Sequence, residues 1–151
     1  GCGVALQPAL MSFHLSALTS SDEADHQAVI DLWHLCGLTR PWNPPEVDLA
    51  QALSNTTSTV LVARTHEAGP VVGTIMAGFD GHRGWLYYLA VNPSTQGTGV
   101  ARALIGAAET WLAERGARKV QLMVRSGNPA AGLYDHLGYE PQDTAVYGRW
   151  L

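Results

Sequence analysis

A short loop containing two glycines, Gln96-Gly97-Thr98-Gly99-Val100-Ala101, has the composition of an anion-binding turn. It follows a strongly apolar run and precedes the longest helical pattern in the chain. The first N–H groups of a helix have no internal partner and carry partial positive charge. Glycines at 97 and 99 remove side chains from the approach to these groups. The loop is therefore a candidate site for a phosphate group.

Two common phosphate motifs do not fit this loop. A P-loop requires a Lys-Ser/Thr pair after its last glycine, and no such pair follows Gly99. A dinucleotide-binding fingerprint requires a small residue where Arg102 stands, and an early strand in the chain. The remaining alternative to a ligand site is a glycine pair that only forms a tight strand-to-helix turn.

Tyr134 is the candidate proton donor further along the chain. A phenol has an ordinary pKa of about 10 and is protonated at neutral pH, so it can act as a general acid. The pattern places Tyr134 about 100° around a short helix from Leu133, at the edge of the apolar face. A half-buried tyrosine that only packs is the alternative. Asn128, just before this helix, suits an N-cap, which is sufficient to explain it.

The elements that would position these residues follow from hydrophobic periodicity and turn residues. They predict the order β-α-α-β-β-β-α-β-α-β, with the middle strands antiparallel and the fourth and fifth parallel, joined by a right-handed helical crossover. The first helix is expected to be capped by Ser21, and Pro129 to begin the last. The expected segments are strands at 12–17, 59–64, 71–79, 85–91 and 119–124, helices at 22–36, 46–53, 98–115 and 129–137, and a last extended segment at 139–151.

The run 85–91 is apolar on both faces, which predicts a central strand covered on both sides. Strict alternation would place four of its side chains on one face and three on the other. The first group is Trp85, Tyr87, Leu89 and Val91, and the second is Leu86, Tyr88 and Ala90. The tryptophans Trp33, Trp85 and Trp111 are interpreted as core residues.

Composition limits the function classes. The 151 residues suit one domain, and a net charge of −4 without a basic run argues against nucleic-acid binding. Two cysteines, Cys2 and Cys36, give no disulfide or metal pattern and favour a reducing, cytoplasmic setting. No apolar stretch is long enough to span a membrane. Residues 1–11 lack signal-peptide features and are interpreted as an expression remnant or a disordered N-terminus, with Met11 as a candidate start.

The motifs together resemble the GNAT superfamily of N-acetyltransferases. Gln96, Gly99 and Ala101 match its Gln/Arg-x-x-Gly-x-Gly/Ala signature. The stretch from Asn128 through Ala131 to Tyr134 is similar to Asn-x-x-Ala-x-x-x-Tyr, one residue shorter, and Tyr134 to Tyr139 is similar to Tyr-x-x-Leu-Gly-Phe/Tyr. The resemblance covers residues 12–151 and implies a single domain with a central mixed sheet and helices on both faces.

The resemblance implies acetyl-CoA as cosubstrate, without a metal, bound between two splayed parallel strands. Tyr134 would be the general acid. The primary amine of a small molecule or peptide would attack the thioester directly in a bacterial, cytoplasmic enzyme, for which a homodimer is one possible assembly. Cofactor-binding residues carried over from the motif are Leu89, Ala90 and Val91, then Gln96, Gly97, Thr98, Gly99, Val100 and Ala101, and finally Asn128 and Ala131.

The acceptor side is specified less closely. The stretches 36–43, 80–84 and 87–89 look like a bacterial YpeA-type subgroup, in which Arg is more usual than Gln96. Candidate cleft residues are Arg40, Trp42, His82 and Tyr87, and candidate bases are Asp80, His82 and Glu46, with Tyr88 as a possible water relay. A surface position for Arg40, a core cap for Trp42 and an exposed turn for His82 are the alternatives. An acyl-CoA-binding sensor without turnover remains the second functional hypothesis.

Overall fold

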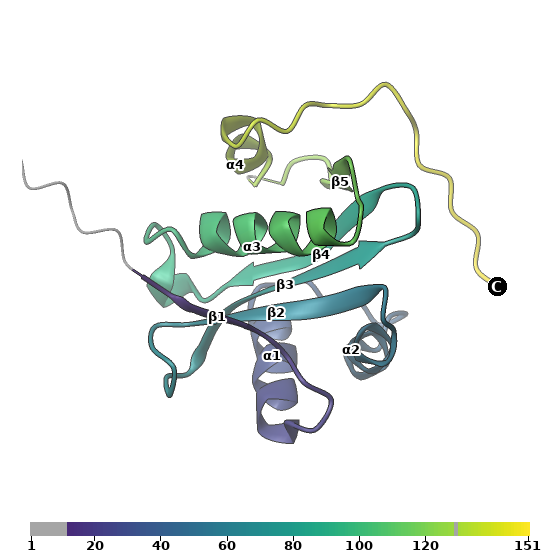
Figure 1. The fold of residues 1–151 in the computed structure, drawn as a ribbon. Helices are drawn as coiled ribbons and strands as arrows, with labels where there is room; N and C mark the ends of the chain where they lie inside the picture. The colour runs from purple at the N-terminus through teal and green to yellow at the C-terminus, as the bar shows by residue number, and fades with distance from the viewer. Residues whose placement is uncertain (1–11, 129) are drawn as a thin grey trace, which may run out of the picture.

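The structure is a computed structural model that describes residues 12–128 and 130–151. Its centre is one mixed β-sheet with helices on both faces (Figure 1). Helices α1 and α2 cover one face, and α3 covers the other. This arrangement agrees with the expected α/β architecture of a mixed sheet with helices on both faces.

Five strands form the sheet in chain order, β1-β2-β3-β4-β5. The pairs β1–β2, β2–β3 and β3–β4 are antiparallel, and β4–β5 is parallel. Short turns allow the antiparallel pairs, whereas the parallel pair needs the crossover through α3. The strands are β1 (His14–Ala17), β2 (Ser58–Arg64), β3 (Val71–Phe79), β4 (Gly84–Val91) and β5 (Val120–Leu122).

The first helical layer consists of α1 (Glu23–Leu35) and α2 (Pro45–Ser54). Asp22, not the expected Ser21, caps α1, because its side chain accepts the backbone N–H of Asp25. Helix α2 begins at a proline, which lacks the N–H that a first helical turn leaves unpaired. Both helices bury their apolar stripes against the sheet, with Trp33 fully buried at the centre.

Helix α3 (Val100–Glu114) covers the opposite face and starts directly after the glycine loop. It is shorter at its beginning than expected, because Gly99 adopts a left-handed conformation that ends the loop. Gly73 in β3 lets the helix approach closely: a Cβ there would lie 2.6 Å from the Val100 side chain and 2.9 Å from Leu104. The beginning of α3 is thus packed directly onto the sheet.

The last elements are β5 and the short helix α4 (Ala131–His136), which lies above α3 in Figure 1. The expected strand in 139–151 is wrong: the structure contains no strand among residues 130–151. Pro141 cannot donate to a ladder, and the polar run 140–144 offers no alternating face. Of the helices in the described ranges, none combines the length and the apolar character that crossing a membrane requires.

Candidate active site between the diverging strands

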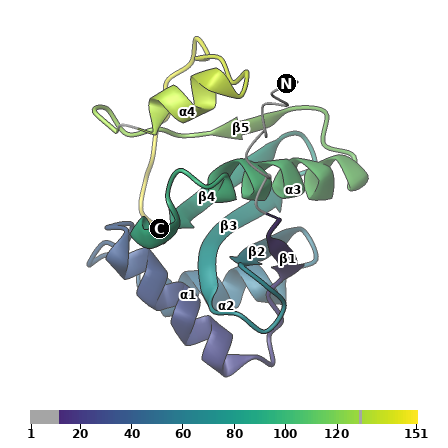
Figure 2. The same cartoon turned by 90° about the vertical axis from the view of Figure 1, so that its left-hand side faces the viewer.

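The parallel strands β4 and β5 pair over only part of β4. Their register joins Gly84 with Val120, Trp85 with Gln121 and Leu86 with Leu122. Strand β4 continues to Val91, so residues 87–91 extend beyond the paired region (Figure 2). This stretch leads directly to the glycine loop, and backbone groups on its β5 side can therefore receive a ligand.

A β-bulge in β4 occurs at this divergence. Between the pairs Met76–Tyr87 and Thr74–Ala90, β4 contains Tyr88 and Leu89 where β3 contains one residue. Tyr88 has a φ of 52°, the only positive φ of a non-glycine residue in the described ranges. Such a conformation is sparsely populated and persists only where surrounding contacts hold it. An extra residue of this kind bends a strand and redirects its side chains.

The bulge overturns the expected division of β4 into two faces. Leu86 packs with the α3 cluster, as do Leu89 and Val91, whereas Tyr88 and Ala90 pack with the α1–α2 cluster. The inserted residue moves each later side chain to the other face. Trp85 is also not a core residue; it is partly exposed, and its indole N–H donates to Asp80 at 3.2 Å. Trp33 is buried, and Trp111 packs partly buried against the α3 cluster.

Thr74 holds the bulge from β3. Its hydroxyl donates a 3.2 Å hydrogen bond to the carbonyl of Tyr88 and accepts one of 3.0 Å from the indole N–H of Trp33. The Thr74 side chain is fully buried, so both bonds are shielded from water. The strained backbone of Tyr88 is therefore tied to Trp33 in the last turn of α1.

The Tyr88 ring lies flat on Trp33, with ring centroids 3.9 Å apart and an interplanar angle of 13°. Its phenol donates a 2.6 Å hydrogen bond to Oδ2 of Asp48 in α2. Burial, followed by this carboxylate, raises the pKa of Tyr88 well above that of a free phenol. Tyr88 is thus a protonated donor with a fixed orientation. Sequence reasoning identified Tyr88 but missed Thr74 and Asp48.

The glycine loop is built to leave backbone N–H groups free. Gly97 and Gly99 have φ values of 80° and 95°, and a Cβ at either would meet nothing within 4 Å. The open space above both glycines suits a ligand rather than a packed turn. The first helical hydrogen bond runs from Ala103 N–H to the Gly99 carbonyl, so no earlier α3 N–H is used within the helix. These features fit a pyrophosphate.

Other loop residues have local roles. A 3-10 turn, η1 (Pro93–Thr95), precedes the glycines and is capped by Asn92, which accepts the N–H of Ser94. The Thr98 hydroxyl donates to the Thr95 carbonyl. Gln96 is exposed at the end of this turn and makes no recorded hydrogen bond to the described residues. The backbone of the loop, more than its side chains, is therefore available to a ligand.

Tyr134 is held in α4 at the edge of the α3 cluster. Its ring meets that of Tyr139 edge-on, with centroids 5.9 Å apart and an interplanar angle of 69°. The Tyr139 phenol donates at 3.0 Å to Glu109 in α3, which fixes this aromatic pair to that helix. Burial raises the pKa of Tyr134 above the ordinary 10.0, so its proton is retained at neutral pH.

The side-chain oxygen of Asn128 accepts the Ala130 N–H at 2.9 Å, which is a local contact in the turn before α4. The expected helix start at Pro129 lies outside the described residues.

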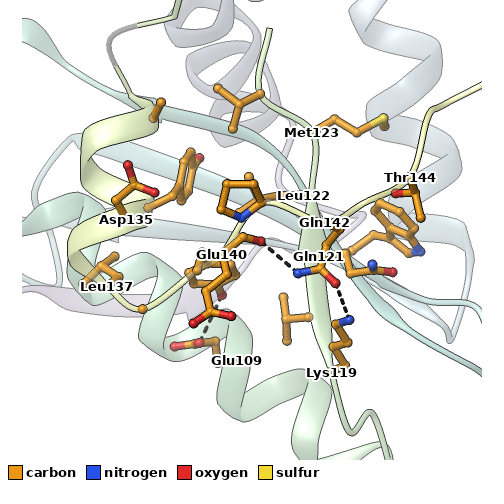
Figure 3. A pocket seen from close by; sticks show the side chains of 18 of the residues that line it. Glu109, Lys119, Gln121, Leu122, Met123, Asp135, Leu137, Glu140, Gln142 and Thr144 are labelled. Atoms are coloured by element: carbon orange, nitrogen blue, oxygen red, sulfur yellow. Dashed lines mark hydrogen bonds between the residues drawn. The ribbon is translucent and has the colours of Figure 1, made fainter. Parts of the chain in front are cut away.

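A cavity of about 830 Å³ lies beside Tyr134, between α3, β5, α4 and the C-terminal segment. Figure 3 shows its polar side, where Lys119 donates to Gln142 at 2.6 Å and Gln142 donates to the Glu140 carbonyl. Ala131 and Tyr134 border the cavity, but residues 96–101 do not. The cavity is therefore distinct from the glycine-loop site.

The candidate acceptor residues are not gathered in one place. Asp80 and His82 occupy the β3–β4 turn, at the opposite end of β4 from the glycine loop (Figure 1). Asp80 accepts the backbone N–H groups of Arg83 and His82, which lowers its pKa and makes it a turn-forming residue. Tyr87 is exposed, with its pKa raised first by burial and then by Asp80.

Three further candidates have other surroundings. The Arg40 guanidinium donates to the carbonyls of Gly37 and Thr39 within its own loop. Trp42 is 58% exposed and does not cap the core. Glu46 lines a shallow groove between α1 and α2 with His26 and Ser20. The acidic side chain that contacts the bulge residue is instead Asp48, whose hydrogen bond with Tyr88 connects α2 to β4.

Comparisons with known proteins agree with this geometry. A family model described as the acetyltransferase (GNAT) family matches residues 26–139. "Acetyltransferase YE1169" of Yersinia enterocolitica is 45% identical over 130 residues, covering 85% of this chain and 91% of the relative. "Acetyltransferase ECA0875" of Pectobacterium atrosepticum is 46% identical over 128 residues, covering 84% and 89%.

Solved structures show the same fold at low sequence identity. The aminoglycoside N-acetyltransferase AAC(6')-Iy in complex with CoA has a TM-score of 0.76 at 18% identity, with 96% of this chain and 99% of that one covered. A ribosomal-protein-alanine N-acetyltransferase from Brucella melitensis biovar Abortus has a TM-score of 0.70 at 21% identity, covering 92% and 100%. From the family match and the bacterial relatives together, this chain belongs to the acetyltransferase (GNAT) family.

Proposed function

We propose that the protein transfers the acetyl group of acetyl-CoA to a primary amine by direct attack. The observation that carries this function is the bulge at Tyr88, which lies just beyond the last β4–β5 pair and is followed along the chain by a glycine loop with free helix N–H groups. Family membership supports an acyl-CoA ligand for this arrangement. Acetyl-CoA supplies an activated acetyl group as a thioester.

Two backbone segments would hold the cosubstrate. The N–H groups of residues 97–101 bind the pyrophosphate at the positive end of α3, where Gly97 and Gly99 leave the approach open. Backbone groups of Leu89–Val91, beyond the β5 pairing, bind the pantetheine arm and polarise the thioester carbonyl. The side chains of Gln96, Asn128 and Ala131 have secondary roles at the rim of this site.

Tyr134 would donate the proton that the departing thiolate requires. Its raised pKa keeps it protonated at neutral pH, and the Tyr139–Glu109 contact restricts its ring. Transfer from such a phenol to a thiolate is uphill, because the pKa of a buried phenol lies above that of a free thiol. This cost is small beside the barrier reductions that enzymes achieve.

The acceptor amine must arrive neutral. Deprotonating a lysine-like amine at pH 7 costs about 4.6 kcal/mol, whereas an α-amine costs about 1 kcal/mol. Because Asp80 is engaged in its turn, we assign no base to it and propose that water beside Tyr88 takes this proton. Structural neighbours include enzymes named for aminoglycosides and for a ribosomal-protein alanine, which supports an amine acceptor in a small molecule or a peptide. We also propose that the enzyme acts in the cytoplasm.

The test is thiol release from acetyl-CoA with a panel of amines, comparing the wild type with Tyr134→Phe. We expect amine-dependent release by the wild type and a loss of about 10²–10⁴-fold in kcat for the variant. Calorimetric affinity for acetyl-CoA should be the same in both proteins. Binding of acetyl-CoA without release from any amine would show a sensor instead of an enzyme. Full turnover by Tyr134→Phe would remove the acid assignment.

A further inference from the structure

Asp48 occupies an unusual position for an acidic residue. Pro45, Leu49 and Ala52 form the buried stripe of α2, and Asp48 shares their 3-1-3 spacing. That spacing places it on the inward face of the helix, where it is half-buried. A carboxylate on an apolar stripe loses hydration and needs a partner to compensate.

The recorded partner of this carboxylate is neutral. Tyr88 donates to Oδ2 at 2.6 Å, and no hydrogen bond from the described residues reaches Oδ1. Within 12–128 and 130–151, the ion pair between Arg64 and Asp25 is the only one, so Asp48 has no lysine or arginine within ion-pair distance. The negative charge is therefore oriented by Tyr88 but not neutralised.

The location of this charge relates it to the proposed reaction. Tyr88 is the bulge residue, and Leu89–Val91 begin directly after it. The Tyr88 side chain packs with the α1–α2 cluster, while Tyr134 packs with the α3 cluster on the other face. A proton donor and an uncompensated carboxylate thus lie on opposite faces of the diverging strands. An acceptor entering from the α1–α2 face would approach the side of the strands that holds Asp48.

We infer that Asp48 binds a cationic group of the acceptor, and that the preferred acceptors are amines carrying a second positive charge. This inference rests on the proposed N-acetyltransferase function and adds its specificity. Asp48 need not abstract the reacting proton, because the proposed route gives that proton to water. A fixed carboxylate is a good partner for a cation that keeps its proton.

The experiment compares pairs of acceptors of equal length. One pair is 1,4-diaminobutane and butylamine, and a peptide pair is Ala-Lys and Ala-Ala. The proteins are the wild type, Asp48→Asn, Asp48→Glu and Asp31→Asn. Asp31 is the matched control, because it is an exposed aspartate on α1 whose side chain accepts from Gln27 at 2.8 Å.

For the wild type we expect kcat/KM to be at least about tenfold higher for the dicationic member of one or both pairs. Asp48→Asn keeps an acceptor for the Tyr88 phenol but removes the charge, so this ratio should fall about tenfold, or ~1.4 kcal/mol. The change should be in KM for the amine, with KM for acetyl-CoA unchanged. Asp48→Glu should restore part of the preference, and Asp31→Asn should keep all of it. The pair that responds distinguishes small diamines from basic peptides.

Equal kcat/KM values for both members of each pair in the wild type would overturn the inference. So would an equal decrease for mono- and dications in Asp48→Asn. If no amine is acetylated, the proposed function fails, and calorimetry with 1,4-diaminobutane then decides the role of Asp48. Loss of 1,4-diaminobutane binding in Asp48→Asn would support a cation-binding role for Asp48. Equal binding by the variant and the wild type would contradict that role. If Asp48→Asn does not fold, the wild type is tested with added salt, which should weaken only the dication's advantage.

Discussion

The indole N–H of Trp33 in α1 donates a 3.0 Å hydrogen bond to the hydroxyl of Thr74 in β3. Both side chains are fully buried, and the same hydroxyl donates to the carbonyl of Tyr88 at the bulge. One threonine therefore connects a helix to the residue with the left-handed conformation. The geometry of the site depends on a core contact as well as on the residues that face a ligand.

Thr74→Val should damage stability and cosubstrate binding together. Valine has the same shape but leaves the Trp33 N–H and the Tyr88 carbonyl without this partner. Unsatisfied buried polar groups cost about 1–3 kcal/mol each, so the free energy of unfolding should fall by about that amount or more. Urea denaturation measures the stability, and KM for acetyl-CoA should rise because the bulge is less well held.

Thr74→Ser is the control for this substitution, since it keeps the hydroxyl and removes only a methyl group. It should retain most of the wild-type KM for acetyl-CoA and lose about 1 kcal/mol of stability through the small cavity. A wild-type KM in Thr74→Val would mean that the bulge holds its shape without this hydrogen bond.

Gly99→Ala tests the glycine loop. Gly99 has a φ of 95° at the N-terminus of α3, a conformation that costs a non-glycine residue about 1–2 kcal/mol. Its added methyl would also enter the open space where the pyrophosphate is proposed to bind. We expect lower stability and a KM for acetyl-CoA raised by at least about tenfold, measured by denaturation and steady-state kinetics.

Gly106→Ala, in the helix that follows the loop, should have the opposite effect on stability. Gly106 lies inside α3, is exposed and has nothing within 4 Å of the position of an added Cβ. Alanine there should stabilise the protein by about 0.5–1 kcal/mol without changing KM. If both alanine variants changed KM equally, the effect would come from α3 as a whole and not from the loop.

The sequence predicted the fold well, and it marked the glycine loop as a turn with positive φ, because both features depend on local patterns. Apolar periodicity marked the strands and helices, and Gly97 and Gly99 marked a backbone with positive φ. Pairing of the last segment was not predictable in the same way. Tyr139–Leu151 has extended character in the sequence, but pairing needs a partner edge and free N–H groups, and Pro141 supplies none.

Two contacts of the candidate site could not be predicted from the sequence, because each joins distant segments of the chain. The Tyr88 bulge reverses the face of every later residue of β4, and alternation alone cannot reveal an inserted residue. Asp48 and Tyr88 are 40 positions apart in the chain, and Trp33 and Thr74 are 41 positions apart. The sequence did contain one signal for Asp48. It is an acidic residue on the apolar stripe of α2, whereas Glu46 lies off that stripe.

Asp80→Ala should reduce thermal stability without reducing kcat. The Asp80 carboxylate accepts two backbone N–H groups of its turn, and these bonds lower its pKa. A carboxyl whose folded pKa is lowered contributes stability above its unfolded pKa, and this contribution is lost as pH falls through the folded value. The difference in Tm between wild type and variant should therefore be present at pH 7 and shrink below about pH 3.8.

The matched substitution is Asp80→Asn, which keeps one acceptor oxygen for the turn. It should retain more of the wild-type Tm than the alanine variant at pH 7. A large loss of kcat in both variants, at unchanged Tm, would instead support Asp80 as the general base.

The dependence of kcat on alkaline pH tests the general-acid role of Tyr134 without a mutation. Burial raises the pKa of this phenol above 10.0, so the protonated form that donates to the thiolate persists through the physiological range. As pH rises, kcat should stay level to about pH 10 and fall only above it, because the acid is lost at its raised pKa. Tyr134→Phe should lack this decrease at its lower rate, measured in brief assays with a saturating amine. A decline of the wild-type kcat centred near pH 8 or 9 would assign the titration to another group and leave Tyr134 a packing residue.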